Sequence, residues 1–140
     1  MSANDTSISP APSLFSLNPF KSHSGKWLPW KIECDAFTDE DWLTLATMVA
    51  TKIKFYEARG IPSGGIKFAE KLNLFADATS TTRLLVDDVL TTGGSMTQAY
   101  NALPNRDGVM TRGIVVFSRM PAEKVPVWVT SIFQLGGLFI

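Results

Sequence analysis

The chain has little of the side-chain chemistry that builds disulfides or zinc sites, because its 140 residues include one cysteine, Cys34, and one histidine, His23. A single cysteine cannot close an intramolecular disulfide, and this pair excludes most zinc-site patterns. We therefore expect a reduced, cytoplasmic protein that folds by packing alone. Cys34 is expected to fill the core, because apolar and charged residues alternate through "WKIECD", and no basic cluster lies near it in sequence to make it a nucleophile.

The chain also lacks an excess of charge of either sign and a long hydrophobic run. Thirteen Lys and Arg balance thirteen Asp and Glu, so no basic field draws the protein toward nucleic acid or an acidic membrane surface. No stretch approaches the ~20 apolar residues that cross a bilayer, and residues 1–13 do not resemble a secretory signal. We expect a soluble protein that binds neither nucleic acid nor membrane.

Apolar side chains are nevertheless plentiful, at 45% of the residues, which is enough for one core in a chain of this length. Residues 1–13 are rich in Ser, Pro and Ala, bury little, and are predicted to form a mobile arm. Residues 14–140 are predicted to form a single domain. The uncharged tail, residues 135–140, is expected to pack on the core or in a homodimer interface.

Strand and helix periodicities alternate along the predicted domain. The predicted helices cover residues 38–54, 66–72 and 96–103. The predicted strands cover residues 30–35, 55–60, 84–88, 111–119 and 125–135. Strands separated by helices are typical of an α/β fold, with a central, mostly parallel sheet flanked by helices on both faces.

The segment "RLLVDDVLTTGGSM", residues 83–96, contains two adjacent aspartates, Asp87 and Asp88, at the end of a predicted buried strand. Burying an ionised carboxylate is costly unless a partner or ligand meets it. Ligands of parallel sheets bind beyond the carboxyl ends of the strands. There the amides of residues 91–95, backed by a helix dipole, could hold a phosphate. The carboxylates could bind sugar hydroxyls or a hydrated Mg²⁺, so the segment predicts a phosphorylated sugar as ligand.

Two other interpretations compete with this one. A nucleoside-triphosphatase also ends an apolar strand with carboxylates, but it requires the loop G-x-x-x-x-G-K-[ST], which no stretch of this chain matches. An ordinary strand, turn and helix with an acidic end requires no ligand at all.

The stretch "LLVDDVLTTGGSM" resembles the thirteen-residue phosphoribosyl-diphosphate motif of the type I phosphoribosyltransferases. By this resemblance, Asp87 and Asp88 are the catalytic pair, which binds the ribose hydroxyls and the metal shell. The resemblance also implies which residues hold the 5-phosphate: Thr91, Thr92, Gly93, Gly94 and Ser95.

A second stretch, "GIPSGGIKFA", is similar to the G-[VI]-P-R-G-G turn of the same family, which binds pyrophosphate. The residues that this similarity implies are Gly60, Ile61, Pro62, Ser63 and Gly64. Ser63 stands where an arginine is common, which removes positive charge from the turn. Arg59 either compensates for that charge or is a plain surface arginine.

Two further stretches resemble the orotate branch of the family. "FKSHSGKWLPWKIECD", residues 20–35, is similar to a small N-terminal hood segment over the base, with His23 in the place of a lysine. "VVFSRMP" is similar to a strand-end Asp-Arg pair, which Arg119 matches and Ser118 does not. Arg119 is therefore expected either to contact the base or to be a strand-end cation. His23 is expected either to contact the base or to be an exposed loop histidine.

The resemblance implies an Mg²⁺-dependent transfer of the phosphoribosyl group to a nitrogenous, pyrimidine-like base, possibly orotate. Family members usually place a further strand and a mobile lid between the two loops. The connection here, residues 74–82, contains no Lys, Arg or His. Either this connection is a minimal lid of an active enzyme, aided by a partner subunit, or the chain is a regulatory protein that binds phosphoribosyl diphosphate or a nucleotide without turnover.

Overall fold

The structure is a computed structural model that describes residues 13–16, 20–21, 27–28 and 31–136. Its contacts divide the chain into two compact units, Met1–Thr38 and Asp39–Ile140, which are described separately. The mobile arm predicted over residues 1–13 lies, apart from Ser13, outside the described residues. The single domain over 14–140 stays a prediction.

The N-terminal unit contains two short antiparallel strand pairs, β1–β4 and β2–β3. Its strands are β1 (Phe15–Ser16), β2 (Phe20–Lys21), β3 (Trp27–Leu28) and β4 (Lys31–Ile32). The strand predicted over 30–35 is wrong beyond Ile32, because Cys34–Ala36 form a 3₁₀ turn that the Phe37 amide closes onto the Cys34 carbonyl at 3.1 Å. Cys34 is buried, as predicted, since a turn hides a side chain as well as a strand does.

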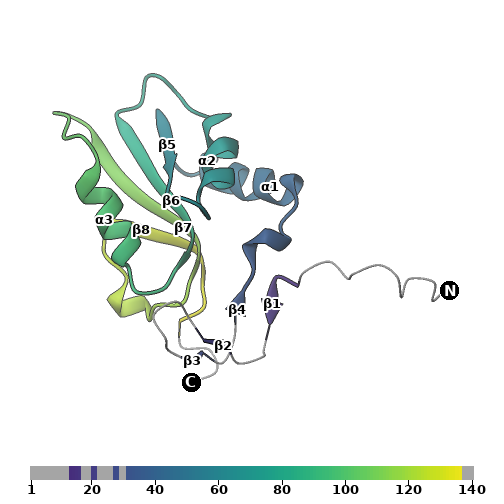
Figure 1. Cartoon of the computed structure of the whole chain (residues 1–140). Helices are drawn as coiled ribbons and strands as arrows, with labels where there is room; N and C mark the ends of the chain where they lie inside the picture. The colour runs from purple at the N-terminus through teal and green to yellow at the C-terminus, as the bar shows by residue number, and fades with distance from the viewer. Residues whose placement is uncertain (1–12, 17–19, 22–26, 29–30, 137–140) are drawn as a thin grey trace. The chain divides into compact units, whose positions relative to one another are not determined.

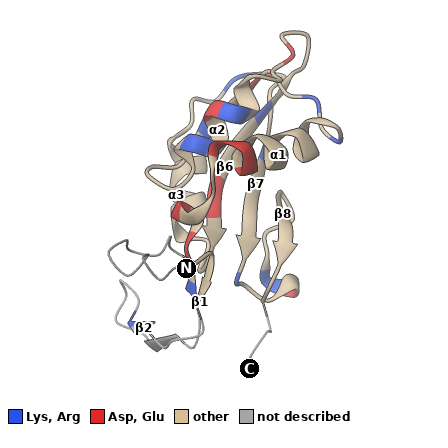
Figure 2. Cartoon of the chain, turned by 90° about the vertical axis from the view of Figure 1, so that its right-hand side faces the viewer, with Lys and Arg blue, Asp and Glu red and all other residues tan. Residues whose placement is uncertain are grey.

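The second unit is built on a four-stranded sheet in the order β5-β6-β7-β8, with every neighbouring pair parallel. Its strands are β5 (Glu57–Gly60), β6 (Thr82–Leu90), β7 (Met110–Ser118) and β8 (Val129–Gln134). All four strands therefore end at the same edge, toward which the arrows of Figure 2 point. The predicted parallel sheet is confirmed.

Helices cover both faces of this sheet, as predicted (Figure 1). α1 (Asp39–Ala50) packs on α2 (Ile66–Asn73) on one face, and α3 (Gly94–Ala102) covers the other. α1 ends earlier than the predicted residue 54, because the chain closes a turn in which the Lys52 amide donates to the Val49 carbonyl at 2.9 Å. None of the described helices is long and apolar enough to span a membrane.

β6 is buried on both faces, which is typical of a central parallel strand. Leu84, Leu85 and Val86 are each at most 3% exposed. Beneath α3, Leu85 belongs to a core cluster with Ile61, Leu90, Met96, Val115 and Val129. On the other face, Phe68 and Leu72 of α2 are fully buried. This packing holds β6 rigidly in place below the loops that follow it.

Among the described residues, a side chain and not another strand lies along the outer edge of β5. The Ala58 amide donates to Asn73 Oδ1 at 2.8 Å, and Asn73 Nδ2 donates to the Ala58 carbonyl at 2.9 Å. The carboxamide of Asn73 thus satisfies both backbone groups that Ala58 would present to a neighbouring strand.

The connections through α2 and α3 have opposite hands. Both advance one strand in the same direction along the sheet, yet the two helices lie on opposite faces. About 98% of parallel crossovers are right-handed, so one of the two is a rare left-handed connection. A strand outside β5, following α2 in the chain, would reverse the direction of the α2 step and make both connections right-handed. In the described residues the chain passes from α2 to β6 without such a strand.

Candidate functional site

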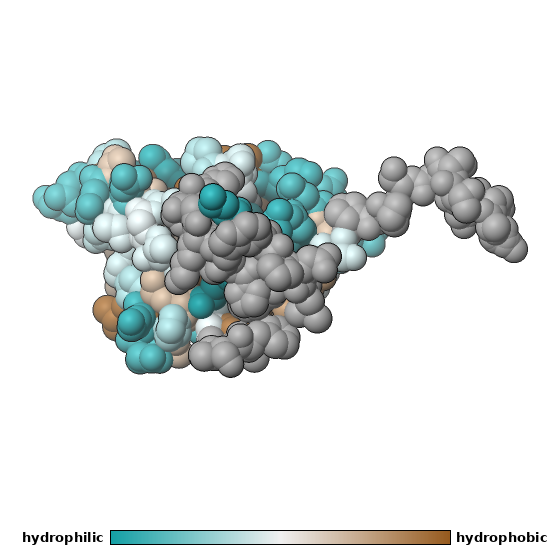
Figure 3. All heavy atoms as spheres, turned by 60° about the horizontal axis from the view of Figure 1, so that its bottom comes forward, coloured by the Kyte–Doolittle hydropathy of each residue, from teal (hydrophilic) through white to brown (hydrophobic). Residues whose placement is uncertain are grey.

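Three loops follow β5, β6 and β7 at the carboxyl edge of the sheet, which is where parallel sheets bind ligands. They comprise residues 61–65, 91–93 and 119–121. Figure 3 views the molecule from this end, where the described surface mixes hydrophilic and apolar residues. The three loops carry most of the residues that the sequence singles out.

The acidic pair lies inside β6, whereas the sequence predicted it at the end of the strand. β6 continues to Leu90 because the two side chains bond the local backbone instead of ending the strand. The Asp88 amide donates to Asp87 Oδ1 at 2.8 Å, and the Val89 amide donates to Asp88 Oδ1 at 2.7 Å. Figure 2 shows this acidic segment of β6 close to the arrowhead.

Asp87 is held in a state that binds a proton near neutral pH. Burial, together with the hydrogen bond and the negative charge of the Asp88 carboxyl, raises the pKa of Asp87 to about 7. In the part of the chain that the structure describes, no Lys or Arg forms an ion pair with either carboxylate. A cation or a pair of hydroxyl donors would therefore give these two carboxylates the partner that no described Lys or Arg provides.

The loop after β6 leads directly into α3, as predicted, although the helix begins at Gly94 and not at Met96. Gly93 has a φ of +83°, a left-handed conformation that glycine adopts at no steric cost. The Gly94 amide lies 3.4 Å from Thr92 Oγ1. Thr92 and Ser95 are exposed, so their hydroxyls are open to a ligand beside the start of α3, where the helix dipole favours an anion.

The loop after β5 lies flush against β6, and glycines permit this approach. A Cβ on Gly64 would overlap the carboxylate of Asp88, and a Cβ on Gly65 would overlap the Val86 carbonyl. The Gly65 amide donates to the Ile61 carbonyl at 2.8 Å, which closes the turn. The loop at 61–65 and the acidic pair therefore form one continuous surface.

The arginines and the histidine that the sequence singles out occupy different places. Arg59 lies on β5, where its Nε is 3.1 Å from Glu57 Oε1. Arg119 follows β7, and burial lowers the pKa of its guanidinium. Its amide donates to the Leu90 carbonyl at 2.8 Å, which holds it beside the end of β6. His23 lies outside the described residues.

Ser118 and the tail also have defined places. Ser118 is fully buried, and its hydroxyl donates to the Met120 carbonyl at 3.2 Å, so it faces the interior and not a ligand. The Leu135 amide donates to the Ser118 carbonyl at 2.8 Å, which joins the start of the tail to β7. Residues 137–140 of the tail lie outside the described residues.

Sequence inspection missed three residues at this edge. Gly65 follows Gly64 in a glycine pair, and that doubled glycine was the available signal. Met120 lies beside Gly93, and Gln134 Nε2 donates to the Met120 carbonyl at 2.5 Å. Neither Met120 nor Gln134 has a sequence pattern that distinguishes it from ordinary strand-end residues.

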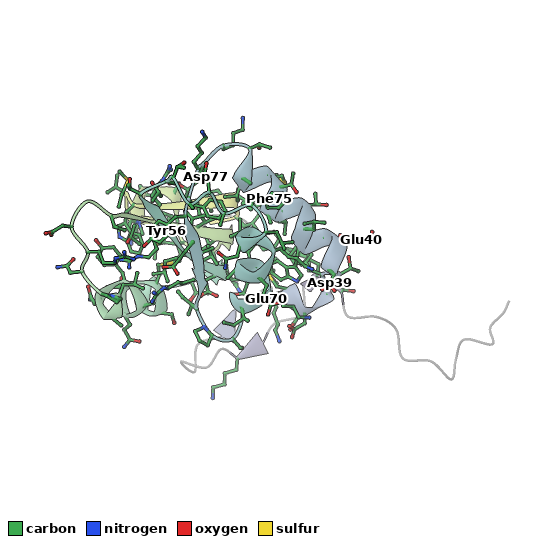
Figure 4. The ribbon with its side chains drawn as sticks, turned by 90° about the horizontal axis from the view of Figure 1, so that it is seen from above. Asp39, Glu40, Tyr56, Glu70, Phe75 and Asp77 are labelled. Atoms are coloured by element: carbon green, nitrogen blue, oxygen red, sulfur yellow. The ribbon has the colours of Figure 1, made fainter. Side chains whose placement is uncertain are left out.

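The connection at residues 74–82 is not a lid, because it lies at the opposite end of the sheet. It joins the end of α2 to the start of β6, and Figure 4 shows Phe75 and Asp77 from that end. The Asp77 amide donates to the Phe55 carbonyl at 2.8 Å, and Ser80 Oγ donates to the Lys54 carbonyl at 3.1 Å. The interpretation of this connection as a minimal lid is therefore wrong.

Comparison with known proteins identifies the fold. No protein-family model matches the chain, and no curated protein matches it in sequence. Orotate phosphoribosyltransferase from Aeropyrum pernix has a TM-score of 0.65 at 18% identity, over 87% of this chain and 89% of that one. UMP synthase from Leishmania donovani has a TM-score of 0.67 at 16% identity, over 87% of this chain and 34% of that one. The chain has the type I phosphoribosyltransferase fold, as the motifs predicted.

Proposed function

We propose that this chain binds phosphoribosyl diphosphate and transfers its phosphoribosyl group to a nitrogenous, pyrimidine-like base, with release of pyrophosphate. The observation that carries the proposal is the contact between Gly64 and the Asp88 carboxylate. It joins the loop after β5 to the acidic pair on β6. β6 ends two residues after Asp88, at Leu90, and the loop at 91–93 then leads into α3 at Gly94. A sugar with a phosphate at one end and a diphosphate at the other matches the order of the phosphate loop, the acidic pair and the loop after β5.

Each group of the donor has a set of residues suited to it. Amides at 91–95 would bind the 5-phosphate, and the left-handed turn at Gly93 with the α3 dipole favours an anion there. Asp87 and Asp88 would accept hydrogen bonds from the ribose hydroxyls. The loop at 60–64 would bind pyrophosphate through its backbone, since Ser63 supplies no positive charge.

The donor set also suits Mg²⁺. The described residues contain no group of three or more His, Cys, Asp and Glu that could hold a metal by itself. Mg²⁺ commonly uses one or two carboxylates, several waters and the phosphates of a substrate, and Asp87 and Asp88 offer the carboxylates. When bound, the ion would offset the charge of the departing pyrophosphate.

The chain's own residues have a positioning task in this reaction. The bond between the anomeric carbon and the pyrophosphate oxygen breaks, a nitrogen of the base forms the new bond to that carbon, and positive charge develops on the sugar. The phosphate loop and the acidic pair would hold the sugar in line with the leaving group and the base. Arg119, beside the end of β6, would attract an acidic base such as orotate, and His23 stays a predicted base contact.

A second candidate is a protein that binds the donor without turnover. The observation in its favour is the place of residues 74–82, which are tied to Lys54 and Phe55 at the far end of the sheet and cannot close over the donor. Excluding water from the reacting carbon matters more for chemistry than for binding.

One experiment separates these candidates. The full chain is incubated with phosphoribosyl diphosphate, Mg²⁺ and a panel of bases, and pyrophosphate release is measured beside donor affinity. Base-dependent release supports the transferase, and binding without release for any base supports the second candidate. The double variant Asp87→Asn with Asp88→Asn should lose at least tenfold in donor affinity, while Asp107→Asn, in an exposed turn, serves as the control. Unchanged affinity of the double variant contradicts both candidates.

A further inference from the structure

The carbonyl of Met120 is held by contacts from both neighbouring strands. Ser118 Oγ, at the end of β7, donates to it at 3.2 Å, and Gln134 Nε2, at the end of β8, donates to it at 2.5 Å. Gly136 packs so closely that a Cβ there would overlap this carbonyl. The backbone at Met120 is therefore tied to the ends of two strands.

The side chain of Met120 extends in the other direction, toward the loop after β6. It packs against the core cluster beneath α3, and its Cε lies 3.4 Å from the place of a Cβ on Gly93. A methionine side chain is unbranched and adaptable, so its position depends on how firmly its backbone is held. The hydrogen bonds to the Met120 carbonyl thus also hold the Met120 side chain in place beside the turn at Gly93.

We infer that Gln134 and Met120 are positioning residues for the phosphate loop, residues 91–95. Gln134 holds the Met120 carbonyl, and the Met120 side chain supports the left-handed turn at Gly93 that arranges the amides of the loop. This inference rests on the proposed function, because it assigns these two residues to the 5-phosphate grip. Neither residue touches the donor itself, so both act through the loop.

Substitution of Gln134 gives the sharpest test, because its side chain is exposed and its loss removes one donor from a folded protein. Affinity for ribose 5-phosphate is measured by calorimetry, and hydrogen exchange is measured at the amides of 92–95. Gln134→Ala should weaken binding roughly fivefold and speed exchange in this loop. Gln134→Glu keeps the size but cannot donate to the Met120 carbonyl when ionised, so it should behave like Gln134→Ala. Wild-type affinity and exchange in both variants would overturn the inference.

Substitution of Met120 tests whether its side chain supports the turn at Gly93. Met120→Ala withdraws the side chain that lies beside Gly93 and should weaken binding of ribose 5-phosphate roughly tenfold, whereas Met120→Leu restores the volume and should stay within about twofold. Met110→Ala is the matched control, since Met110 is 60% exposed at the start of β7, the far end of the sheet. Equal affinity of Met120→Ala and Met110→Ala would overturn the inference, and Gln134→Ala decides the matter if Met120→Ala does not fold.

The two proposals fail in different ways. If the wild-type chain binds neither ribose 5-phosphate nor phosphoribosyl diphosphate, the proposed function is wrong. Exchange at 92–95 in the Gln134 variants still reports on the support that Met120 gives to the turn at Gly93. Unchanged exchange there would refute the positioning role, whether or not a ligand binds.

Discussion

Asp87→Asn should stabilise the fold above pH 7, although it removes a group from the proposed site. The folded protein holds the pKa of Asp87 at about 7, above its ordinary value of 3.8. A raised pKa means that the fold favours the protonated carboxyl. This contribution is therefore fully present below pH 3.8, is lost as the pH rises, and is gone above about pH 7. An asparagine does not ionise, so the variant avoids the cost of holding a charged carboxylate in this buried place at high pH.

The size of the effect follows from the shift of the pKa. Raising the pKa of Asp87 from 3.8 to about 7 corresponds to a free energy of about 4 kcal/mol, which is an upper limit. Asp87 is partly exposed and shares its hydrogen bond with Asp88, and solvent screening reduces the figure to about 2 kcal/mol. The variant should exceed the wild type by this amount at pH 8 and by much less at pH 4.

Urea unfolding followed by tryptophan fluorescence at pH 4 and pH 8 measures this difference. Asp107→Asn, in an exposed turn, should change stability equally at both pH values and serves as the control. A variant Asp87→Asn that is no more stable than the wild type at pH 8 would refute the account of a strained, proton-binding carboxyl pair.

Two further substitutions test the close packing of the fold. Gly64→Ala should push the carboxylate of Asp88 out of place, cost about 1–3 kcal/mol of stability and reduce donor affinity at least tenfold in calorimetry. Retained donor affinity would contradict the view that the close approach of Gly64 to the Asp88 carboxylate is needed for binding. Asn73→Ala should leave two backbone groups of Ala58 without partners and lower the free energy of unfolding by about 1–3 kcal/mol. Asn105→Ala, on an exposed loop, should have little effect on the same measurement.

The sequence predicted the sheet and the loop after β6 because both depend on local signals. The buried run at 84–86 indicates a central strand, and the glycines at 93–94 indicate a turn that opens a helix. The position of the acidic pair was predicted less accurately. The Asp88 and Val89 amides donate to the carboxylates of Asp87 and Asp88, and such hydrogen bonds leave no trace in a hydrophobic pattern.

The remaining features depend on contacts between distant residues. Gln134 and Met120 are fourteen positions apart, and only the ends of β7 and β8 bring them together. The 74–82 connection lies at the far end of the sheet because, in the described residues, the chain passes directly from α2 to β6. Spacing along the chain carries neither kind of information.

The carboxamide of Asn73 has a consequence for how the protein behaves in a crowded solution. The unpaired backbone groups of an uncovered sheet edge can pair with a strand of another chain, which leads to domain swapping and fibril growth. Because one side chain occupies both hydrogen-bonding positions of Ala58, the middle of this edge strand offers a further polypeptide no free backbone group at that residue.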